Sequence, residues 1–151
     1  METRVNVFEK AQNGLKALFG VGAYLKKSSI EPALAHLIDI RISGINGCAY
    51  CLDMHAKDAR AGGETEQRIY SLPAWREMSI YSERERAALA WAEAVNSHKV
   101  PQEVFDEARK VLSEEELFDL TLAVGILTTW NKLNIALHPV KPGSYTVGQF
   151  A

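Results

Sequence analysis

Apolar residues recur along this chain at the spacing of an amphipathic helix. Leu34, Leu37, Ile38 and Ile42 are one example, because residues three and four positions apart share a face of an α-helix. The sustained alternation of apolar and polar residues that marks a β-strand is missing from the sequence, and so is an Asn-Gly hairpin. The pattern therefore predicts an all-α protein.

Helix start and stop signals divide the sequence into segments. Ser28, Ser82 and Ser113 each precede a glutamate at the spacing of a capping box, and Pro101 marks a further helix start. Gly62 and Gly63 predict the end of a helix. These signals divide the chain into about six to seven helices. They include an N-terminal helix over 6–26 and a short helix over 65–71, the latter followed by a loop over 72–75.

The length and charge of the chain limit its organisation and its partners. The 151 residues suit a single domain over 1–151, with an extended tail from about Pro139. A net charge of −2 gives no excess of positive charge that would indicate binding to nucleic acid or to an anionic membrane. The first residues lack the apolar run of a signal peptide, so we expect a cytoplasmic protein with no membrane partner.

The segment 117–137 is the most apolar part of the sequence. It contains Asp119, Asn131, Lys132 and Asn134, which are too many polar groups for a simple membrane span. Its apolar side chains nevertheless occupy most faces of the helix that it predicts. Because one small domain cannot easily surround such a helix, we expect a homo-oligomer that covers the remaining face.

Cys48 and Cys51 form a Cys-x-x-Cys sequence, and His55 follows one helical turn later. On a helix these three side chains share one face over two turns. Asn46 can cap that helix, which places Cys48 in the first turn, where the helix dipole favours a thiolate. His55 can exchange a proton with Cys51. We therefore expect a reversible disulfide between an activated thiol and a resolving thiol.

Two other interpretations of this motif have different chemical consequences. Buried cysteines beside a structural histidine would have no catalytic role. A metal site would combine Cys48, Cys51 and His55 with a fourth ligand such as His36. Zinc sites usually take Cys-x-x-Cys from a turn rather than from a helical strip, so we expect redox chemistry with no metal and no cofactor.

His36 is the histidine outside the motif with the strongest case for a role. It lies twelve residues before Cys48, on the helix that immediately precedes the cysteine helix. If the two helices form a close pair, His36 faces the thiols and tunes a proton relay. His98 is expected in a surface loop, and His138 at the end of the long helix.

The cysteine motif and its surroundings resemble a known family. The segment from Arg41 to Cys51, RISGINGCAYC, is followed by His55 and then by KDAR at 57–60. This sequence closely resembles the AhpD-like core of the carboxymuconolactone decarboxylase superfamily. The segments 72–77, 81–91 and 130–132 also resemble small stand-alone members, and the similarity covers residues 15–140.

The resemblance implies an AhpD-like helical bundle that forms trimers or hexamers. It also implies thiol-dependent reduction of peroxides, with a thioredoxin-like protein or a dihydrolipoyl carrier protein as reductant. Cys48, Cys51 and His55 match the AhpD motif, whereas His36 takes the place of a glutamate and Tyr50 that of a histidine. The proton relay is therefore altered. The nearby acids do not have the spacing of the missing glutamate; they are Glu31 and Asp39.

The cysteine pair also bears on the type of reaction. Typical lactone decarboxylases of the superfamily lack it, so its presence favours redox catalysis. A decarboxylase-like reaction and a non-catalytic redox-sensing role are the alternatives. The helix N-terminus favours attack by Cys48, whereas the base His55 and the family resemblance favour Cys51. We expect Cys51 to attack the peroxide and Cys48 to resolve the product.

Overall fold

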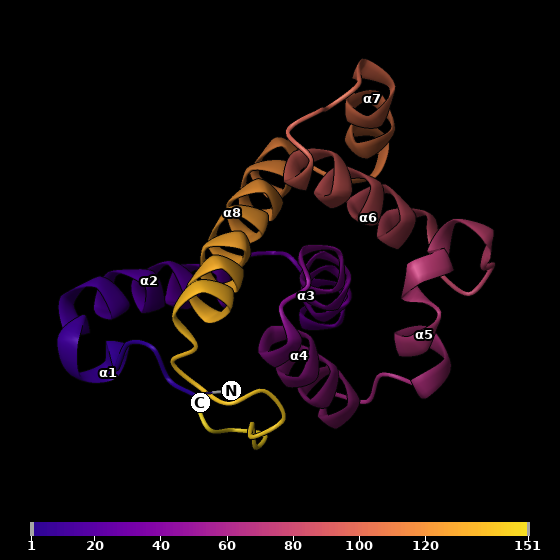
Figure 1. The fold of residues 1–151 in the computed structure, drawn as a ribbon. Helices are drawn as coiled ribbons and strands as arrows, with labels where there is room; N and C mark the ends of the chain where they lie inside the picture. The colour runs from indigo at the N-terminus through magenta and orange to yellow at the C-terminus, as the bar shows by residue number, and fades with distance from the viewer. Residues whose placement is uncertain (1, 151) are drawn as a thin grey trace.

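The computed structural model describes residues 2–150, and its regular elements are all helical (Figure 1). Within this range there are eight α-helices, one 3₁₀ helix and no β-strand, which confirms the all-α prediction with more helices than expected. In chain order they are α1 (Val7–Lys10), α2 (Gln12–Leu25), α3 (Pro32–Asn46), α4 (Ala49–Ala61), α5 (Glu66–Tyr70), η1 (Leu72–Glu77), α6 (Glu83–Asn96), α7 (Gln102–Val111) and α8 (Glu114–Leu137).

Helix α3 lies at the centre of the fold (Figure 1). It packs against α4, α6 and α8, while α2 packs on α8 and α7 packs on α6. The core consists mainly of aliphatic side chains from α3, α6 and α8, among them Leu37, Ile38, Ile42, Leu89 and Leu120. Burial of these side chains holds α3 against α6 and α8, α4 packs along α3, and the cysteine motif lies at the junction of α3 and α4.

The start of α3 differs from the predicted capping box. Ser82 and Ser113 form the predicted boxes at α6 and α8, but α3 starts at Pro32 with Glu31 as an N-cap that makes no side-chain bond. A helix capped by Ser28 would need a backbone N–H at position 32 to bond the Ser28 carbonyl, and proline has none. The Ser28 hydroxyl instead accepts a hydrogen bond from the Ile30 N–H.

The predicted N-terminal helix over 6–26 is divided in two. Ala11 lies between α1 and α2 with φ −130° and ψ 32°, which is not helical. Before α1, the N–H groups of Arg4 and Val5 both donate to the Leu137 carbonyl at the end of α8. Val7 is buried as well, so tertiary contacts of this segment override its local helix propensity.

Two further segments also depart from their predicted conformations. The expected loop over 72–75 is part of η1, and its Trp75 is buried with its indole N–H donated to Glu93. The tail after α8 is not extended but folds back onto α4. Its Tyr145 is buried and donates its hydroxyl to Asp58, while Lys57 donates to the Tyr145 carbonyl. These bonds hold the tail beside the cysteine motif.

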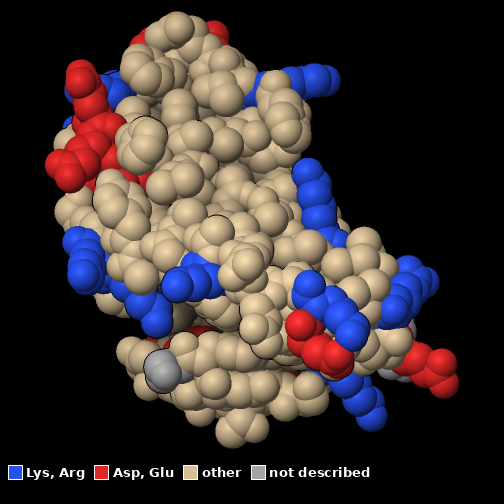
Figure 2. Space-filling model, turned by 90° about the vertical axis from the view of Figure 1, so that its left-hand side faces the viewer, with Lys and Arg blue, Asp and Glu red and all other residues tan. Residues whose placement is uncertain are grey.

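Helix α8 leaves some large apolar side chains in solvent, with Phe118 61% and Ile135 43% exposed. Figure 2 shows the side of the molecule that carries α1, α2 and part of α8: its upper central part is a broad uncharged surface, and charged side chains are scattered over its lower half. Among residues 2–150, each helix is too short or too polar to cross a lipid bilayer. The expected homo-oligomer remains a prediction.

Candidate functional site

The junction between α3 and α4 consists of only two residues. Gly47 ends α3 in the left-handed region, with φ 73°, which an L-amino acid adopts only at a cost. Cys48 then serves as the N-cap of α4. Asn46 is therefore not the predicted cap, because it is the last residue of α3. Its side-chain amide donates instead to the side-chain oxygens of Asn96 and Asn131 and so joins α3 to α6 and α8.

Cys48 and Cys51 are joined by a disulfide, as the sequence predicts, with their Cα atoms 5.4 Å apart. Cys48 precedes the helix and Cys51 is the third residue within it, where its N–H points at the Cys48 sulfur. Both side chains are buried, with 1% exposure each. The helix N-terminus thus lies beside both sulfurs, so its dipole favours a thiolate on either cysteine of the reduced pair.

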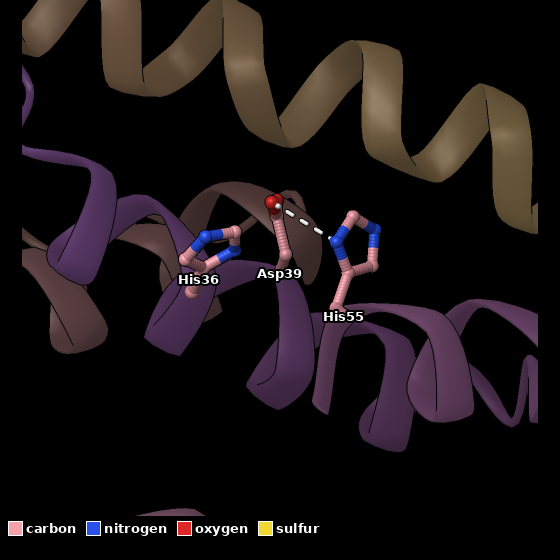
Figure 3. Close-up of side chains that lie close together, drawn as sticks. All are labelled: His36, Asp39 and His55. Carbon is pink, nitrogen blue, oxygen red and sulfur yellow. Dashed lines mark ion pairs between the residues drawn. The ribbon is translucent and has the colours of Figure 1, made fainter. Parts of the chain in front are cut away.

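His55 lies one helical turn beyond Cys51 and faces α3. Its Nδ1 is 3.4 Å from Oδ2 of Asp39, and the two side chains are 16% and 23% exposed. His36 lies one turn before Asp39 on the same helix, and Figure 3 shows the Asp39 carboxylate between the two imidazole rings. One ligand atom from each of the three residues lies within 4.8 Å of those from the other two.

Burial changes the protonation of this cluster. Desolvation lowers the pKa of His55 to about 4, against a smaller opposing effect of the Asp58 charge. Desolvation also raises the pKa of Asp39 to about 7, an effect that the electrostatic interaction with His36 partly opposes and the charge of Asp58 reinforces. At neutral pH the His55 imidazole is therefore neutral and able to accept a proton, and Asp39 exchanges protons in the same pH range.

Three side-chain polar atoms are buried without a hydrogen-bond partner among residues 2–150. They are Nδ1 of His36, the hydroxyl of Tyr50 and Oδ1 of Asn134. Burial raises the pKa of Tyr50, and the charges of Asp53 and Asp58 act in the same direction, so its hydroxyl stays protonated at neutral pH. Its ring and that of Tyr145 meet edge to face, with centroids 6.4 Å apart. Tyr50 therefore contributes a donor and an apolar surface, but no charge.

A cavity of about 660 Å³ connects the cluster with the surface. His36, Asp39 and His55 line it, and its other walls are largely apolar. Cys51 also lines the cavity, whereas Cys48 does not. Of the two cysteines, Cys51 is thus the one that borders space for a small molecule. The apolar walls include Leu15, Phe19, Ile38, Trp130 and Leu133.

The structure therefore brings His36 and His55 together around Asp39, places Cys51 on the wall of the same cavity, and leaves Asn46 outside the cluster. The sequence did not indicate Asp39 as a site residue, because Asp39 does not have the spacing of the glutamate in the AhpD motif. The available signal was its spacing from His36, since residues three apart share a helix face. The sequence also did not indicate Asp58, because no local pattern shows that the tail hydroxyl of Tyr145 bonds to it.

Comparison with known proteins assigns the chain to a family. The sequence profile of the Carboxymuconolactone decarboxylase family matches residues 10–94. The chain belongs to this family. Uncharacterized protein YdfG of Bacillus subtilis is 44% identical over 140 residues, which span 91% of this chain and 95% of that protein. YnjA of Escherichia coli, also uncharacterized, is 26% identical over 116 residues, or 74% of this chain and 63% of its own length.

Solved structures place this family member among the AhpD-like folds. ATU0492 of Agrobacterium tumefaciens, a protein of unknown function proposed to be an antioxidant defence protein AhpD, superposes with a TM-score of 0.88. It is 37% identical, over 93% of this chain and 99% of its own. The debrominase Bmp8 is 25% identical with a TM-score of 0.78, over 85% of this chain and 71% of its own. The fold is thus shared by proteins with different described roles.

Proposed function

We propose that this protein is a thiol-dependent peroxidase that reduces hydroperoxides through its Cys48–Cys51 pair. The observation that carries the proposal is the position of Cys51, which joins a disulfide and also lines the cavity beside His55 and Asp39. A nucleophile, a resolving thiol and a base are the groups that such a reaction requires. The AhpD-like fold and the antioxidant role proposed for ATU0492 support the same reaction.

The first step begins from the reduced pair. The neutral imidazole of His55 takes the proton of Cys51, and the thiolate attacks one oxygen of the hydroperoxide. The oxygen–oxygen bond breaks, so Cys51 becomes a sulfenic acid and the other oxygen leaves as an alkoxide. The proton held by His55 then passes to the alkoxide and gives the alcohol. Asp39, beside Nδ1 of His55, stabilises the imidazolium that forms between these proton transfers.

The second step closes the disulfide. The thiol of Cys48 attacks the sulfenic sulfur of Cys51, a sulfur–sulfur bond forms, and the hydroxyl leaves as water after taking a proton. An external dithiol then reduces the disulfide by exchange and is itself oxidised. A thioredoxin-like protein or a dihydrolipoyl carrier protein is the class of reductant that fits this role. The cycle consumes two electrons and returns both cysteines to thiols.

The cavity supports an organic hydroperoxide in preference to hydrogen peroxide. About 660 Å³ of largely apolar space is in the range of sites that enclose a small organic molecule. Hydrogen peroxide would leave these walls in contact with water, whereas an alkyl or aryl group would cover them and gain binding energy. His36, Asp39 and His55 line the same cavity as Cys51 and would provide polar groups for the peroxide end of such a substrate.

Peroxide turnover by cysteine variants tests the proposal. Consumption of cumene hydroperoxide is measured with dithiothreitol as reductant for wild type, Cys48→Ser, Cys51→Ser and a surface control, His98→Asn. His98 is exposed with φ 59°, a conformation that asparagine tolerates. We expect sustained turnover by wild type and the control, and only background rates for both cysteine variants.

The outcomes also separate the alternatives. A redox-sensing protein would be oxidised once, with one equivalent of peroxide consumed and no turnover. A decarboxylase-like enzyme would leave the peroxide unchanged in all four proteins. Equal peroxide consumption by wild type and Cys51→Ser would contradict the proposed mechanism.

A further inference from the structure

His36, Asp39 and His55 form a group of three ligand-bearing side chains that the cysteine chemistry does not fully explain. Their donor atoms lie within 4.8 Å of one another, although the residues come from two helices (Figure 3). A proton relay to Cys51 needs His55 and one partner. A second imidazole on the far side of the same carboxylate adds a third inward-facing donor.

The donor set is characteristic of a transition-metal site. Two imidazoles and one carboxylate are the protein ligands of many catalytic zinc and iron centres, which leave further positions open to water or substrate. Around an ion bound at about 2.1 Å, neighbouring ligand atoms lie roughly 3–3.5 Å apart. Nδ1 of His55 and Oδ2 of Asp39 lie 3.4 Å apart, within this range, and a donor atom of His36 lies near enough for a side-chain rotation to bring it into the same range.

The backbone holds these ligands in place before any ion binds. His36 and Asp39 are three residues apart on one face of α3, and the two-residue junction at Gly47 and Cys48 fixes α4 beside it. The Cys48–Cys51 disulfide constrains the first turn of α4, one turn before His55. A site built on two packed helices in this way requires little rearrangement of the chain on binding.

A polar atom without a partner provides the second observation. Nδ1 of His36 is buried, and within residues 2–150 no group of the protein forms a hydrogen bond with it. A buried polar atom that makes no bond is costly, and bound metal is one way of satisfying it. The cavity opens on the same three side chains, which leaves a path for the ion and room for its remaining ligands.

We propose that His36, Asp39 and His55 bind a divalent transition-metal ion of the Zn²⁺ or Fe²⁺ class, with open coordination positions facing the cavity. This site differs from the metal site with Cys48 and Cys51 as ligands that the sequence left open, because the disulfide occupies both sulfurs. Asp39, which was not among the ligands of that cysteine-based site, supplies the carboxylate of this one. If the proposed peroxidase function holds, an ion here would occupy the nitrogens of the relay, so metal would inhibit the reaction with peroxide.

Cobalt binding tests the site without reference to activity. Co²⁺ is added to the oxidised protein after treatment with a chelator, and its visible absorption and the heat of binding are recorded. We expect saturation at one ion per chain. His36→Ala and Asp39→Ala should each weaken binding by at least about a hundredfold, beyond the loss typical of an outer-shell partner. Added Zn²⁺ should displace the cobalt.

Control variants distinguish this site from other sources of binding. His98→Asn and Asp106→Asn remove exposed side chains of the same types and should bind as wild type does. The double variant Cys48→Ser, Cys51→Ser should also retain the site. Circular dichroism checks the helical fold, and His36→Gln replaces His36→Ala if the alanine variant unfolds.

Three results would overturn the proposal: no saturable Co²⁺ binding by wild type, unchanged binding by the His36 and Asp39 variants, or loss of binding in the double cysteine variant. Each of these can occur while peroxide turnover remains intact. Conversely, cobalt can bind to a protein that never reacts with peroxide. The failure of one proposal is therefore separable from the failure of the other.

Discussion

Asp39 of α3 and His55 of α4 face each other across the helix junction, with Oδ2 and Nδ1 3.4 Å apart. A carboxylate beside Nδ1 favours the tautomer that carries its proton on that nitrogen, which leaves Nε2 free to accept a proton. His55 is also one turn from Cys51. His55 thus offers a free nitrogen on the same face of α4 as Cys51, which lines the cavity.

The first prediction concerns Asp39 as a positioning residue. Asp39→Asn keeps the size of the side chain but removes the charge that stabilises the His55 imidazolium, so reaction of the reduced protein with cumene hydroperoxide should slow by roughly 10–100-fold. Asp39→Glu should recover part of the rate. The rate of sulfenic acid formation is measured by chemical trapping, with exposed Asp106→Asn as control. Equal rates for Asp39→Asn and the control would rule out this role.

The second prediction assigns roles to the two sulfurs. Because Cys51 lines the cavity and Cys48 does not, Cys48→Ser should accumulate a sulfenic acid on Cys51 after one equivalent of peroxide. Cys51→Ser should stay reduced under the same conditions. Mass spectrometry of trapped peptides makes the comparison. Oxidation found only in the Cys51→Ser protein would reverse the assignment.

The fold was predictable where local chemistry determines it. Ser82 and Ser113 cap their helices as the sequence indicates, and the glycine pair at 62 and 63 follows the end of α4. The predictions failed where distant contacts decide the conformation. The break at Ala11 accompanies bonds from the N-terminal segment to Leu137, and the folded tail depends on Tyr145. Such contacts join residues far apart in the sequence and leave no local pattern.

The sequence predicted the part of the site that lies within one helix, but not the contact that forms between two helices. Cys51 and His55 share a face of α4 by simple periodicity, and the disulfide follows from the same spacing. The meeting of Asp39 with His55 depends on how α3 rotates against α4, which the packing of core side chains determines. Asn46 was assigned to the wrong helix because Gly47, rather than a capping residue, sets the boundary.

The third prediction concerns His36, which takes the position of the AhpD glutamate. If its imidazole tunes the proton relay, His36→Ala should slow the reaction with peroxide by roughly 10–1,000-fold, the scale of one lost acid–base group. His36→Glu should retain or raise the activity, because it restores the residue found in AhpD. Rates are measured on metal-free protein, so that an effect on metal binding does not contribute. A wild-type rate for a folded His36→Ala would leave His36 with a packing role.

The fourth prediction concerns stability at low pH. Burial alone would raise the pKa of Glu93, but hydrogen bonds from Trp75, Arg41 and Arg76 outweigh it and hold the pKa below its usual value of 4.5. A carboxyl group whose pKa is lower in the folded state stabilises the protein above its unfolded pKa, and this contribution is lost as pH falls through the folded value. Stability should therefore decrease below about pH 4.5.

Glu93→Gln tests this linkage by denaturant unfolding at several pH values. The variant should lose about 2 kcal/mol of unfolding free energy at neutral pH, the scale of hydrogen bonds to a charged group. Its stability should also fall less steeply than that of wild type in acid. The control Glu107→Gln changes an exposed carboxylate paired with Lys110 and should differ little from wild type. Parallel pH curves for wild type and Glu93→Gln would contradict the prediction.

The last prediction concerns assembly. Phe118 projects from α8 with 61% of its surface exposed, and Ile135 adds a second exposed apolar side chain near the other end of the helix. Burying such groups against another copy of the chain would remove apolar surface from water, and the family resemblance favours a trimer or a hexamer.

Light scattering should therefore give a multiple of 16.8 kDa at micromolar concentration. Phe118→Asp should shift the mass toward that of one chain, because an interface cannot readily bury an unpaired carboxylate. Tyr70→Asp is the matched control, since Tyr70 is a similarly exposed aromatic residue on α5 and its replacement should leave the assembly unchanged. A mass near 16.8 kDa for the wild type would show that the apolar face of α8 remains in solvent.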